Sequence, residues 1–332
     1  GEGRGDERVL HAVRRGVRPV AARLRRGPRG AGRWGQRSPS GRGEWCGPAG
    51  RRARGAAHRS TPRSTAGAPV STDVPAPPDP ATGDGAPSPF RARGPIDDAT
   101  AVEVLAAGRL EILGRMPWTS NATFLVDVTP PDDGPLPLIQ GVYKPGRGER
   151  PLHDFPPGLY RREAAAWELA HLLGWGLVPP TIVRDGPFGE GSVQLYVPCD
   201  YEEHYFTLHH DPDRVVDLRR LAAFDLVANN ADRKAGHVLA GLDGHLWAID
   251  NALCFHHQFK VRTVVWDFAG DPIGDDLAGD LGRLLSDGLS DGLADLLDPF
   301  ERDAVVARAR AVLDAGELPA DPSGRRVPWP LV

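Results

Sequence analysis

Methionine and cysteine are scarce in this chain, and long apolar runs are missing from it. It has one methionine, Met116, and three cysteines, Cys46, Cys199 and Cys254, and it contains no run of 18 apolar residues. Widely spaced cysteines in odd number argue against a disulfide framework or a cysteine-based zinc site, and they suit a reducing compartment. Because a membrane helix needs a long apolar run, we expect a cytoplasmic protein that is not an integral membrane protein.

Acidic residues are scarce in the first part of the chain. Residues 1–66 hold 17 arginines against four acidic residues, so the net charge of −4 leaves −17 for residues 67–332. Sequence rich in Arg, Gly, Ala, Pro and Ser buries too little apolar surface to offset the entropy of ordering. We predict that residues 1–95 form a disordered Arg/Gly/Pro-rich extension and linker. We interpret it as non-functional or mis-assigned; the alternative is an arm for nucleic acid or an anionic membrane surface, which we do not favour.

Regular patterns begin at Ile96. Helix-start residues, apolar periodicity and turn residues predict short strands and amphipathic helices. The predicted order is a helix at 97–107, strands at 110–113, 123–128 and 138–143, a helix at 159–173, strands at 181–184 and 192–197, a helix at 215–229, strands at 237–239 and 246–249, and helices at 275–287 and 302–313. This is an α+β class: a small antiparallel-sheet lobe at 96–198, with one helix after the third strand, and a mainly helical lobe at 199–332.

A lysine and a glutamate on neighbouring elements form the first candidate site. Lys144 ends the third predicted strand, and Glu163 lies in the first turns of the helix that follows. A strand lysine that is ion-paired to a helix glutamate can be aimed at the α- and β-phosphates of a nucleotide. Taken alone, Lys144 is better explained as a solvated surface lysine.

A polar stretch after the predicted helix 215–229 forms the second candidate site. It contains Asp232 and Lys234, and Asp250 follows 18 residues after Asp232 at the end of an apolar strand. Phosphoryl transfer needs one carboxylate for the hydroxyl proton, another for a metal and a cation beside the γ-phosphate. The alternative is a helix end closed by an Asx-type turn.

The order of these motifs resembles the catalytic core of phosphatidylinositol 3-/4-kinase-like proteins. The motifs are Val142-Tyr143-Lys144, Arg162-Glu163, Asp232-Arg233-Lys234-Ala235-Gly236-His237 and Ile249-Asp250-Asn251. They are most similar to an uncharacterised actinobacterial branch of that family, and more distantly similar to HipA-like and protein kinases. The resemblance covers residues 96 to about 285, and it implies a two-lobed protein-kinase-like fold that binds ATP with Mg²⁺ or Mn²⁺.

The resemblance also implies a role for each site residue. Asp232 and Lys234 match the catalytic positions, and Asp250 matches the metal-binding aspartate. The implied nucleotide-binding residues are Lys144, Glu163, Ser120, Asn121, Val197 and Pro198, the last two at the hinge that receives adenine.

Three departures from the family's pattern concern catalysis more than fold. His237 stands where the family has a metal-binding asparagine, and imidazole suits Mn²⁺ or Zn²⁺ better than Mg²⁺. Asp250 is followed by Asn251-Ala252 in place of Phe-Gly, and the loop at residues 117–122 lacks glycine. The sequence contains no His-Glu-x-x-His motif, the spacing that would indicate a zinc hydrolase. Asp267, in Trp266-Asp267-Phe268, fits the metal role less well than Asp250.

We therefore expect an enzyme, an ATP-dependent phosphotransferase acting on a hydroxyl group. Its acceptor is a protein, a small molecule or a lipid headgroup, and the sequence does not distinguish among these. The alternatives are a pseudokinase that binds nucleotide without turnover, favoured by His237 and the glycine-poor loop, and an enzyme that transfers AMP.

Overall fold

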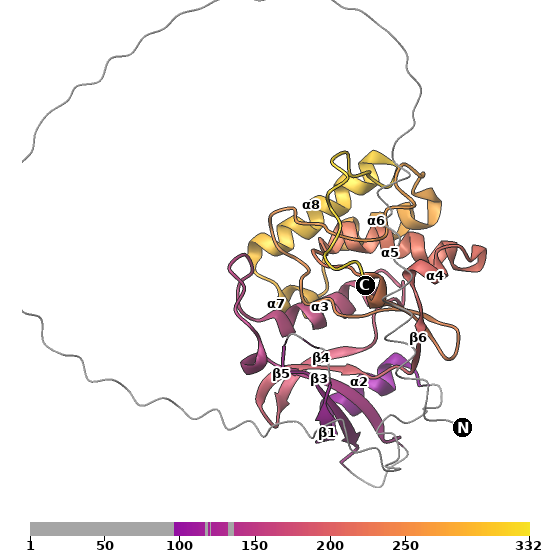
Figure 1. Ribbon diagram of the computed structural model, residues 1–332. Helices are drawn as coiled ribbons and strands as arrows, with labels where there is room; N and C mark the ends of the chain where they lie inside the picture. Colours follow the sequence, from indigo (N-terminus) through magenta and orange to yellow (C-terminus); the bar gives the residue numbers. More distant parts are fainter. Residues whose placement is uncertain (1–95, 117–118, 120, 132–135) are drawn as a thin grey trace, which may run out of the picture. The chain divides into compact units, whose positions relative to one another are not determined.

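The computed structural model describes residues 96–116, 119, 121–131 and 136–332. These residues form two antiparallel sheets and a group of helices (Figure 1). The predicted α+β class, with an antiparallel sheet followed by a mainly helical part, is confirmed. The predicted disordered extension at 1–95 lies outside the described residues, and the boundary placed after residue 198 stays a prediction.

Five antiparallel strands form the first sheet, in the spatial order β1-β2-β3-β5-β4. The strands are β1 (Arg109–Arg115), β2 (Phe124–Thr129), β3 (Ile139–Pro145), β4 (Thr181–Gly186) and β5 (Gly189–Leu195). The predicted meander of the first three strands and the helix after the third are confirmed; that helix is α3 (Leu159–Leu172). The order of the last two strands was not predicted. The chain leaves α3, forms β4 at the edge, and turns back at residues 187–188 so that β5 pairs with β3.

Helix α2 (Asp98–Ala107) packs on this sheet. Asp97 caps it, because its Oδ1 accepts a hydrogen bond from the Thr100 backbone N–H at 2.9 Å. Helix α2 and the sheet form one cluster of buried apolar side chains. Its members are Ala101, Val104, Leu105, Phe124, Val126, Val128, Ile139, Tyr143, Val193, Leu195 and Val197. This packing fixes β3, the strand that carries Lys144.

A second sheet has three short antiparallel strands in the order β6-β7-β8. They are β6 (Cys199–His204), β7 (Val238–Gly241) and β8 (Leu246–Ala248). The sequence predicted β7 and β8. It did not predict β6, because that strand is mostly polar and exposed and shows no alternation of apolar residues. Strand β8 ends just before Asp250, so this small sheet determines where the carboxylate lies.

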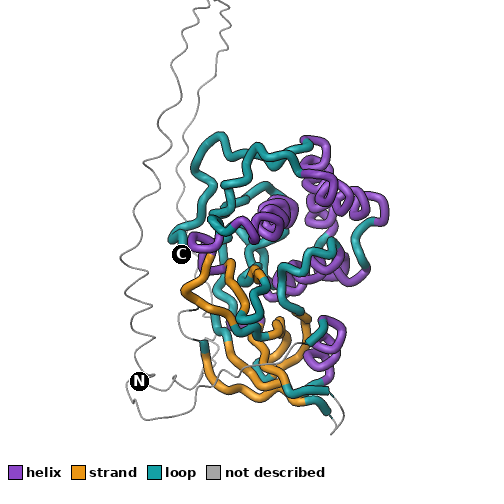
Figure 2. Tube along the Cα trace, turned by 90° about the vertical axis from the view of Figure 1, so that its right-hand side faces the viewer, coloured by secondary structure: helices purple, strands orange, loops and turns teal. Residues whose placement is uncertain are grey.

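Most of the helices follow the sheet region in sequence and gather on one side of it (Figure 2). They are α4 (Tyr205–Leu208), α5 (Val215–Ala228), α6 (Gly274–Asp287), α7 (Asp291–Leu296) and α8 (Pro299–Ala315), with short 3₁₀ turns η2 (Gly146–Gly148), η3 (Pro212–Arg214) and η4 (Ala235–His237). Helices α4 and α7 were not predicted, since each is under two turns long and offers little periodicity. In the described part of the chain, no helix has the length and apolar character needed to span a bilayer.

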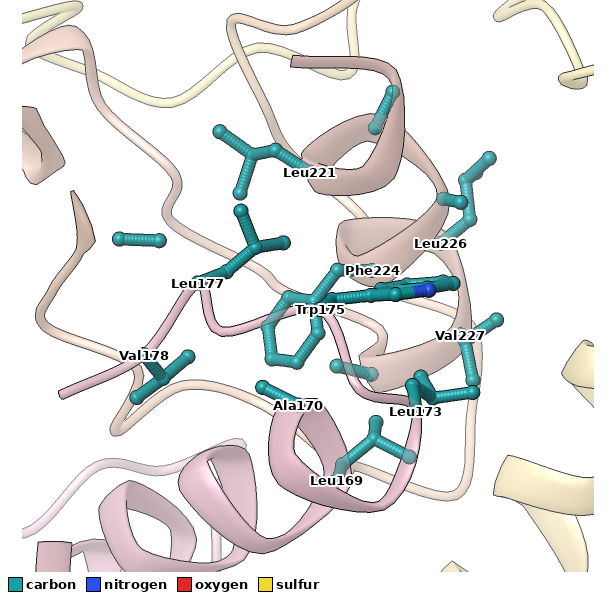
Figure 3. Packing of buried hydrophobic residues seen from close by; sticks show 14 of the residues in the cluster. Leu169, Ala170, Leu173, Trp175, Leu177, Val178, Leu221, Phe224, Leu226 and Val227 are labelled. Atoms are coloured by element: carbon teal, nitrogen blue, oxygen red, sulfur yellow. The ribbon is translucent and has the colours of Figure 1, made fainter. Parts of the chain in front are cut away.

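The largest apolar cluster joins α3 to the helical part (Figure 3). Leu169, Ala170 and Leu173 approach Phe224 and Val227 of α5, with the loop after α3 packed between the two helices. Burying one such side chain contributes about 1.5–3 kcal/mol. Helix α3 therefore packs tightly on the helical part, although it lies within the sheet region of the sequence.

A buried ion pair also anchors α3. Arg162 of α3 pairs with Glu301 of α8, and its Nε donates to the Cys254 carbonyl oxygen at 3.0 Å. Because removing one partner of a buried pair leaves an uncompensated charge, this contact strongly constrains the orientation of the helix. Glu163, the next residue, is oriented by the same anchor.

Candidate active site

A cavity of about 340 Å³ lies between β3 and β5 on one side and the residues of η4 and the end of β8 on the other. The residues that line it include Met116, Thr119, Asn121, Ala122, Thr123, Val142, Lys144, Glu149, Leu159, Tyr160, Glu163, Gln194, Leu195, Tyr196, Val197, Cys199, Tyr201, Lys234, His237, Leu239, Ile249 and Asp250. Pockets of this size hold small ligands and cofactors. Apolar side chains and several charged groups thus share one cavity.

Lys144 connects two carboxylates in this cavity. Its Nζ forms an ion pair with Glu163 and lies 3.0 Å from Asp250 Oδ1. Burial acts to lower the pKa of the Lys144 ammonium, but Asp250 and Glu163 outweigh burial and raise it. The lysine is therefore charged, and it joins the strand, the helix and the end of β8 at one point.

Glu163 is almost fully buried and uses both of its oxygens. One contacts Lys144, and Oε2 accepts a hydrogen bond from the Asn251 backbone N–H at 3.0 Å. Burial raises the pKa of this carboxyl, and the charge of Lys144 acts in the opposite direction. Glu163 thus positions the lysine and also the residue next to Asp250.

Asp250 has a backbone conformation that non-glycine residues seldom adopt. Its φ is +56°, in the left-handed region, which costs energy and is held only when the surroundings determine it. Half of its side chain is exposed, and Lys144 lowers the pKa of the carboxyl well below its usual range. The conformation directs an ionised carboxylate into the cavity.

His237 lies beside Asp250, with its Nε2 3.4 Å from Asp250 Oδ2. Burial lowers the pKa of His237 to about 4. The imidazole is therefore neutral at neutral pH. Its Nδ1 accepts a hydrogen bond from the Lys234 backbone N–H at 3.4 Å, which places the ring proton on Nε2, toward Asp250.

Asp232 and Lys234 form an ion pair of their own, with Lys234 Nζ 3.1 Å from Asp232 Oδ2. The Asp232 backbone N–H donates to Asn230 Oδ1 at 2.9 Å. Burial raises the pKa of the Asp232 carboxyl, while Lys234 acts to lower it. Lys234 lines the cavity, whereas Asp232 is not among the described residues on its wall. Asp232 therefore adjoins the cavity through its partner Lys234.

Arg233, between these two residues, organises the loop. Its guanidinium is fully buried; Nε lies 3.1 Å from Asp225 Oδ1, Nη1 donates to the Ile249 carbonyl oxygen at 2.8 Å, and Nη2 donates to Asn251 Oδ1 at 2.6 Å. Thr263 donates to Asp225 Oδ2 at 2.8 Å. A single side chain thus ties the loop at residues 232–234 to α5 and to the end of β8.

The last described residues of the chain lie against the same loop. The Ala235 backbone N–H donates to the Leu331 carbonyl oxygen at 2.8 Å, and the Thr263 N–H donates to the Arg326 carbonyl oxygen at 3.1 Å. Leu331 and Val332 pack partly buried against the main core. This stretch supports the loop that contains Asp232 and Lys234 from outside the cavity.

Protein Rv2133c of Mycobacterium tuberculosis is 39% identical to this chain over 273 residues, which cover 70% of this chain and 95% of that protein. The chain belongs to the Rv2133c family. No family model matches the sequence.

Solved structures similar to this Rv2133c relative are more distant. Hydra Fam20 with sugar has a TM-score of 0.43 at 16% identity and covers 64% of this chain and 86% of its own. The Golgi casein kinase with Mn/ADP bound has a TM-score of 0.43 at 16% identity, covering 65% and 74%. The Helicobacter pylori proinflammatory kinase CtkA has a TM-score of 0.38 at 9% identity, covering 64% and 94%.

The predicted α+β class, an antiparallel sheet followed by a mainly helical part, is established for this Rv2133c relative; its two-lobed, protein-kinase-like character stays a prediction. An antiparallel sheet carries a strand lysine that is ion-paired to the glutamate of the following helix, and a helical lobe carries the loop and the second carboxylate. The membership in the phosphatidylinositol 3-/4-kinase-like group also stays a prediction.

The structure brings most of the predicted site residues together. Lys144, Glu163, Lys234, His237 and Asp250 all line the cavity. These five residues come from β3, from α3, from the stretch through η4 and from the end of β8, so their proximity is a result of folding. Their roles remain predictions.

The other predicted residues are placed less uniformly. Asn121 lines the cavity, with its Oδ1 accepting from the Arg150 N–H at 2.9 Å, and Val197 also lines it. Pro198 is not among the described residues of the lining, and Ser120 lies outside the described residues. Asp267 accepts a hydrogen bond from the Tyr205 hydroxyl at 2.7 Å, away from this wall.

Sequence reasoning missed the supporting residues Asp225, Arg233 and Asn251. A signal existed in each case: Asp225 interrupts the apolar run of α5, and Arg233 and Asn251 are adjacent to predicted site residues. A buried polar residue inside an apolar helix needs a partner, so its position indicates a network. The identity of the partner cannot be found without the fold.

Proposed function

We propose that this protein is a kinase-like phosphotransferase that moves the γ-phosphate of ATP to the hydroxyl group of an acceptor. The observation that carries the proposal is the contact of Lys144 with both Glu163 and Asp250 inside one cavity. An ion pair that served only to stabilise the fold would not require a cavity beside it. It is the arrangement that binds a polyphosphate together with a cation. We also propose membership in the phosphatidylinositol 3-/4-kinase-like group.

The residues of the cavity suit ATP. Lys144 and Lys234 supply two ammonium groups for phosphates. Val142, Leu195 and Leu239 add apolar side chains that suit a base. Val197 and Pro198 are proposed as the hinge beside the adenine, and Ser120 and Asn121 as part of the loop near the phosphates.

A divalent cation, Mg²⁺ or Mn²⁺, fits the carboxylate of Asp250. In the described part of the chain there is no group of three or more His, Cys, Asp or Glu side chains arranged to hold a metal. Asp250 and His237 form a pair only, so the nucleotide phosphates would supply the other ligands, as is usual for Mg²⁺. The cation, when bound, neutralises negative charge on the phosphates.

In the proposed reaction, Asp232 receives the proton of the acceptor hydroxyl. The hydroxyl oxygen forms a bond to the γ-phosphorus, the bond from that phosphorus to the β–γ bridging oxygen breaks, and ADP leaves with that electron pair. The raised pKa of Asp232 suits a general base, and Lys234, 3.1 Å away, supplies positive charge beside the transferred group.

A nucleotide-binding regulator without turnover is the second candidate. The observation that favours it is His237, whose neutral imidazole occupies the neighbourhood of Asp250 that kinases of this kind give to a metal-binding amide. Imidazole is a poor ligand for Mg²⁺. If His237 prevents a productive metal, nucleotide still binds through Lys144.

Label transfer from ATP separates these functions. The full-length protein is incubated with ATP labelled at the α- or the γ-phosphate, with Mg²⁺ or Mn²⁺, and with serine peptides, sugars or phosphoinositide vesicles as acceptors. We expect γ-label on an acceptor, and loss of that label in Asp232→Asn. Asp303→Asn, which changes an exposed carboxylate on α8, is the control.

Each other outcome has a defined meaning. Transfer of α-label indicates AMP transfer and contradicts the γ-phosphate mechanism. Stabilisation by ATP of the wild-type protein with no label on any acceptor supports the regulator. Transfer that persists in Asp232→Asn removes the assigned base.

A further inference from the structure

Lysine is rare in this chain, and all three lysines lie at or next to the candidate site. The sequence has 40 basic residues, of which only Lys144, Lys234 and Lys260 are lysine and the rest are arginine. Lys144 and Lys234 line the cavity. Lysine provides a compact point charge that arginine does not reproduce. Lys260, which the functional assignment leaves unused, therefore requires its own explanation.

Lys260 bridges two segments that are distant in sequence. Its Nζ lies 3.1 Å from Asp154 Oδ2 and 5.4 Å from the centre of the Phe155 ring. The side chain of Lys260 is only 17% exposed and that of Asp154 is 33% exposed. The hydrogen bond from Lys260 lowers the pKa of Asp154, and burial acts in the opposite direction. The contact is thus a partly buried ion pair that lies beside an aromatic ring.

On one side of this contact is the segment that follows Asp250. The Lys260 backbone N–H donates to Asn229 Oδ1 at 2.7 Å, and Asn229 Nδ2 donates to the carbonyl oxygens of His256 and Gln258, each at 2.7 Å. Asn229 itself is buried and ends α5 in the left-handed conformation. This side of the contact is therefore rigidly attached to the helical lobe.

On the other side is the loop that leads into α3. Phe155 packs with Leu159, Ala231, Ala252 and Leu253 in a small separate cluster. Its ring also meets the His256 ring edge-on, with the centroids 5.2 Å apart. The loop is thus held against the catalytic loop and the residues after Asp250.

The loop in turn determines where α3 begins. Glu149 accepts hydrogen bonds from the Gly158 and Tyr160 backbone N–H groups, at 3.1 and 2.6 Å, and so caps the first turn. Glu163 lies one turn further along α3 and contacts Lys144. A contact that fixes the loop at Asp154 therefore fixes the helix start, and through it the Glu163–Lys144 pair.

We propose that Lys260 is a positioning residue of the nucleotide site, which holds α3 in place by tying Asp154 to the segment after Asp250. This inference rests on the proposed function for its effect on ATP. Lys260 does not touch the cavity wall and takes no part in bond making. Its role is to keep Glu163 where that side chain can orient Lys144.

A charge exchange tests the proposal in the full-length protein. The variants are Lys260→Asp, Asp154→Lys and the double exchange, with Lys260→Met to keep an apolar stem over Phe155. We expect each single variant to raise the KM for ATP about 3- to 10-fold, with a smaller change in kcat. The double exchange restores the KM to within about twofold, because the pair is re-formed with opposite polarity. Arg220→Met, which breaks the partly exposed Asp217–Arg220 pair on α5, far from the Asp154 loop in sequence, serves as the control.

Hydrogen exchange gives a readout that does not need nucleotide. In Lys260→Met the amides of residues 150–163 should exchange faster than in the wild type, while those of α8 should not change. The proposal would be overturned if the amides of residues 150–163 exchange at the wild-type rate in Lys260→Met. It would also be overturned if the double variant, Lys260→Asp with Asp154→Lys, does not restore slow hydrogen exchange in this segment. If the wild type binds no ATP but the exchange result holds, the proposed function fails and the positioning contact stands.

Discussion

Asp225 and Arg233 form an ion pair from which solvent is excluded: both side chains are fully buried, and Arg233 Nε lies 3.1 and 3.3 Å from the two carboxylate oxygens of Asp225. Arg233 is also the residue between the proposed catalytic residues Asp232 and Lys234. The pair therefore links the stability of the helical lobe to the geometry of the catalytic loop.

Breaking this pair is expected to destabilise the protein strongly. Arg233→Met leaves the Asp225 carboxylate buried without its cation, and such changes cost about 3–5 kcal/mol. Urea unfolding followed by circular dichroism measures the change. Arg109→Met, which breaks an exposed pair with Glu111 on β1, should change the free energy of unfolding by less than about 1 kcal/mol. Similar losses in the two variants would contradict the role given to Arg233.

A lysine-directed reagent can map the nucleotide site, because the chain has only three lysines. An acyl-phosphate derivative of ATP transfers its acyl group to a neutral amine close to the bound phosphates. We expect labelling of Lys234 and slower labelling of Lys144, whose carboxylate neighbours raise its pKa and keep it protonated. Lys260 lies off the cavity wall and should stay unlabelled. Peptide mass mapping, with excess ATP as competitor, checks this; equal labelling of all three would contradict the site.

The sequence predicted the elements well where local signals are strong. Strands β1 to β3 and helices α3, α5, α6 and α8 have apolar periodicity, caps and turn residues that identify them without a fold. The side-by-side placement of β3 and β5 was missed, because pairing between strands that are distant in sequence leaves no local pattern. The polar strand β6 was missed for lack of any alternation.

The candidate site divides in the same way. Lys144, Glu163, Asp232 and Asp250 stand in motifs with characteristic spacing, so the sequence alone selected them. The supporting contacts could not be predicted. Arg233 binds Asp225 in α5 and Asn251 after β8, and Lys260 binds Asp154 more than 100 residues earlier in the chain. Such contacts depend on the three-dimensional arrangement of several elements.

Cys199 offers a chemical test of the cavity wall. Burial raises the pKa of its thiol to about 12, and its Sγ lies 3.4 Å from the Val197 carbonyl oxygen. Since the thiolate is the reactive form, alkylation by iodoacetamide at pH 8 should be far slower than for a free cysteine with a pKa near 8.5. ATP should slow it further, because Cys199 lines the cavity. Mass spectrometry of the Cys199 peptide gives the rate, with Cys199→Ser as control. Fast alkylation that ATP does not affect would contradict this placement.

His237 should influence which metal supports activity. Its neutral imidazole lies 3.4 Å from Asp250, where a nitrogen ligand favours Mn²⁺ over Mg²⁺. Replacing it by an amide oxygen in His237→Asn is expected to shift the ratio of Mg²⁺- to Mn²⁺-supported label transfer toward Mg²⁺ by about tenfold. His245→Asn, at a site whose Nε2 hydrogen-bonds the Gly176 carbonyl oxygen at 2.7 Å, is the control. A ratio that does not move would show that His237 contacts no metal.

The packing of Leu331 and Val332 near the catalytic loop has a practical result for anyone who produces this protein. Val332 lies close to Gly236, and the Leu331 carbonyl oxygen receives the Ala235 backbone N–H at 2.8 Å. Any purification tag or fusion partner joined after Val332 would therefore start beside the catalytic loop and could pull that support away. Purification tags for turnover assays are best placed before Gly1. A tag after Val332 that lowers the rate of turnover would indicate that this contact supports the loop.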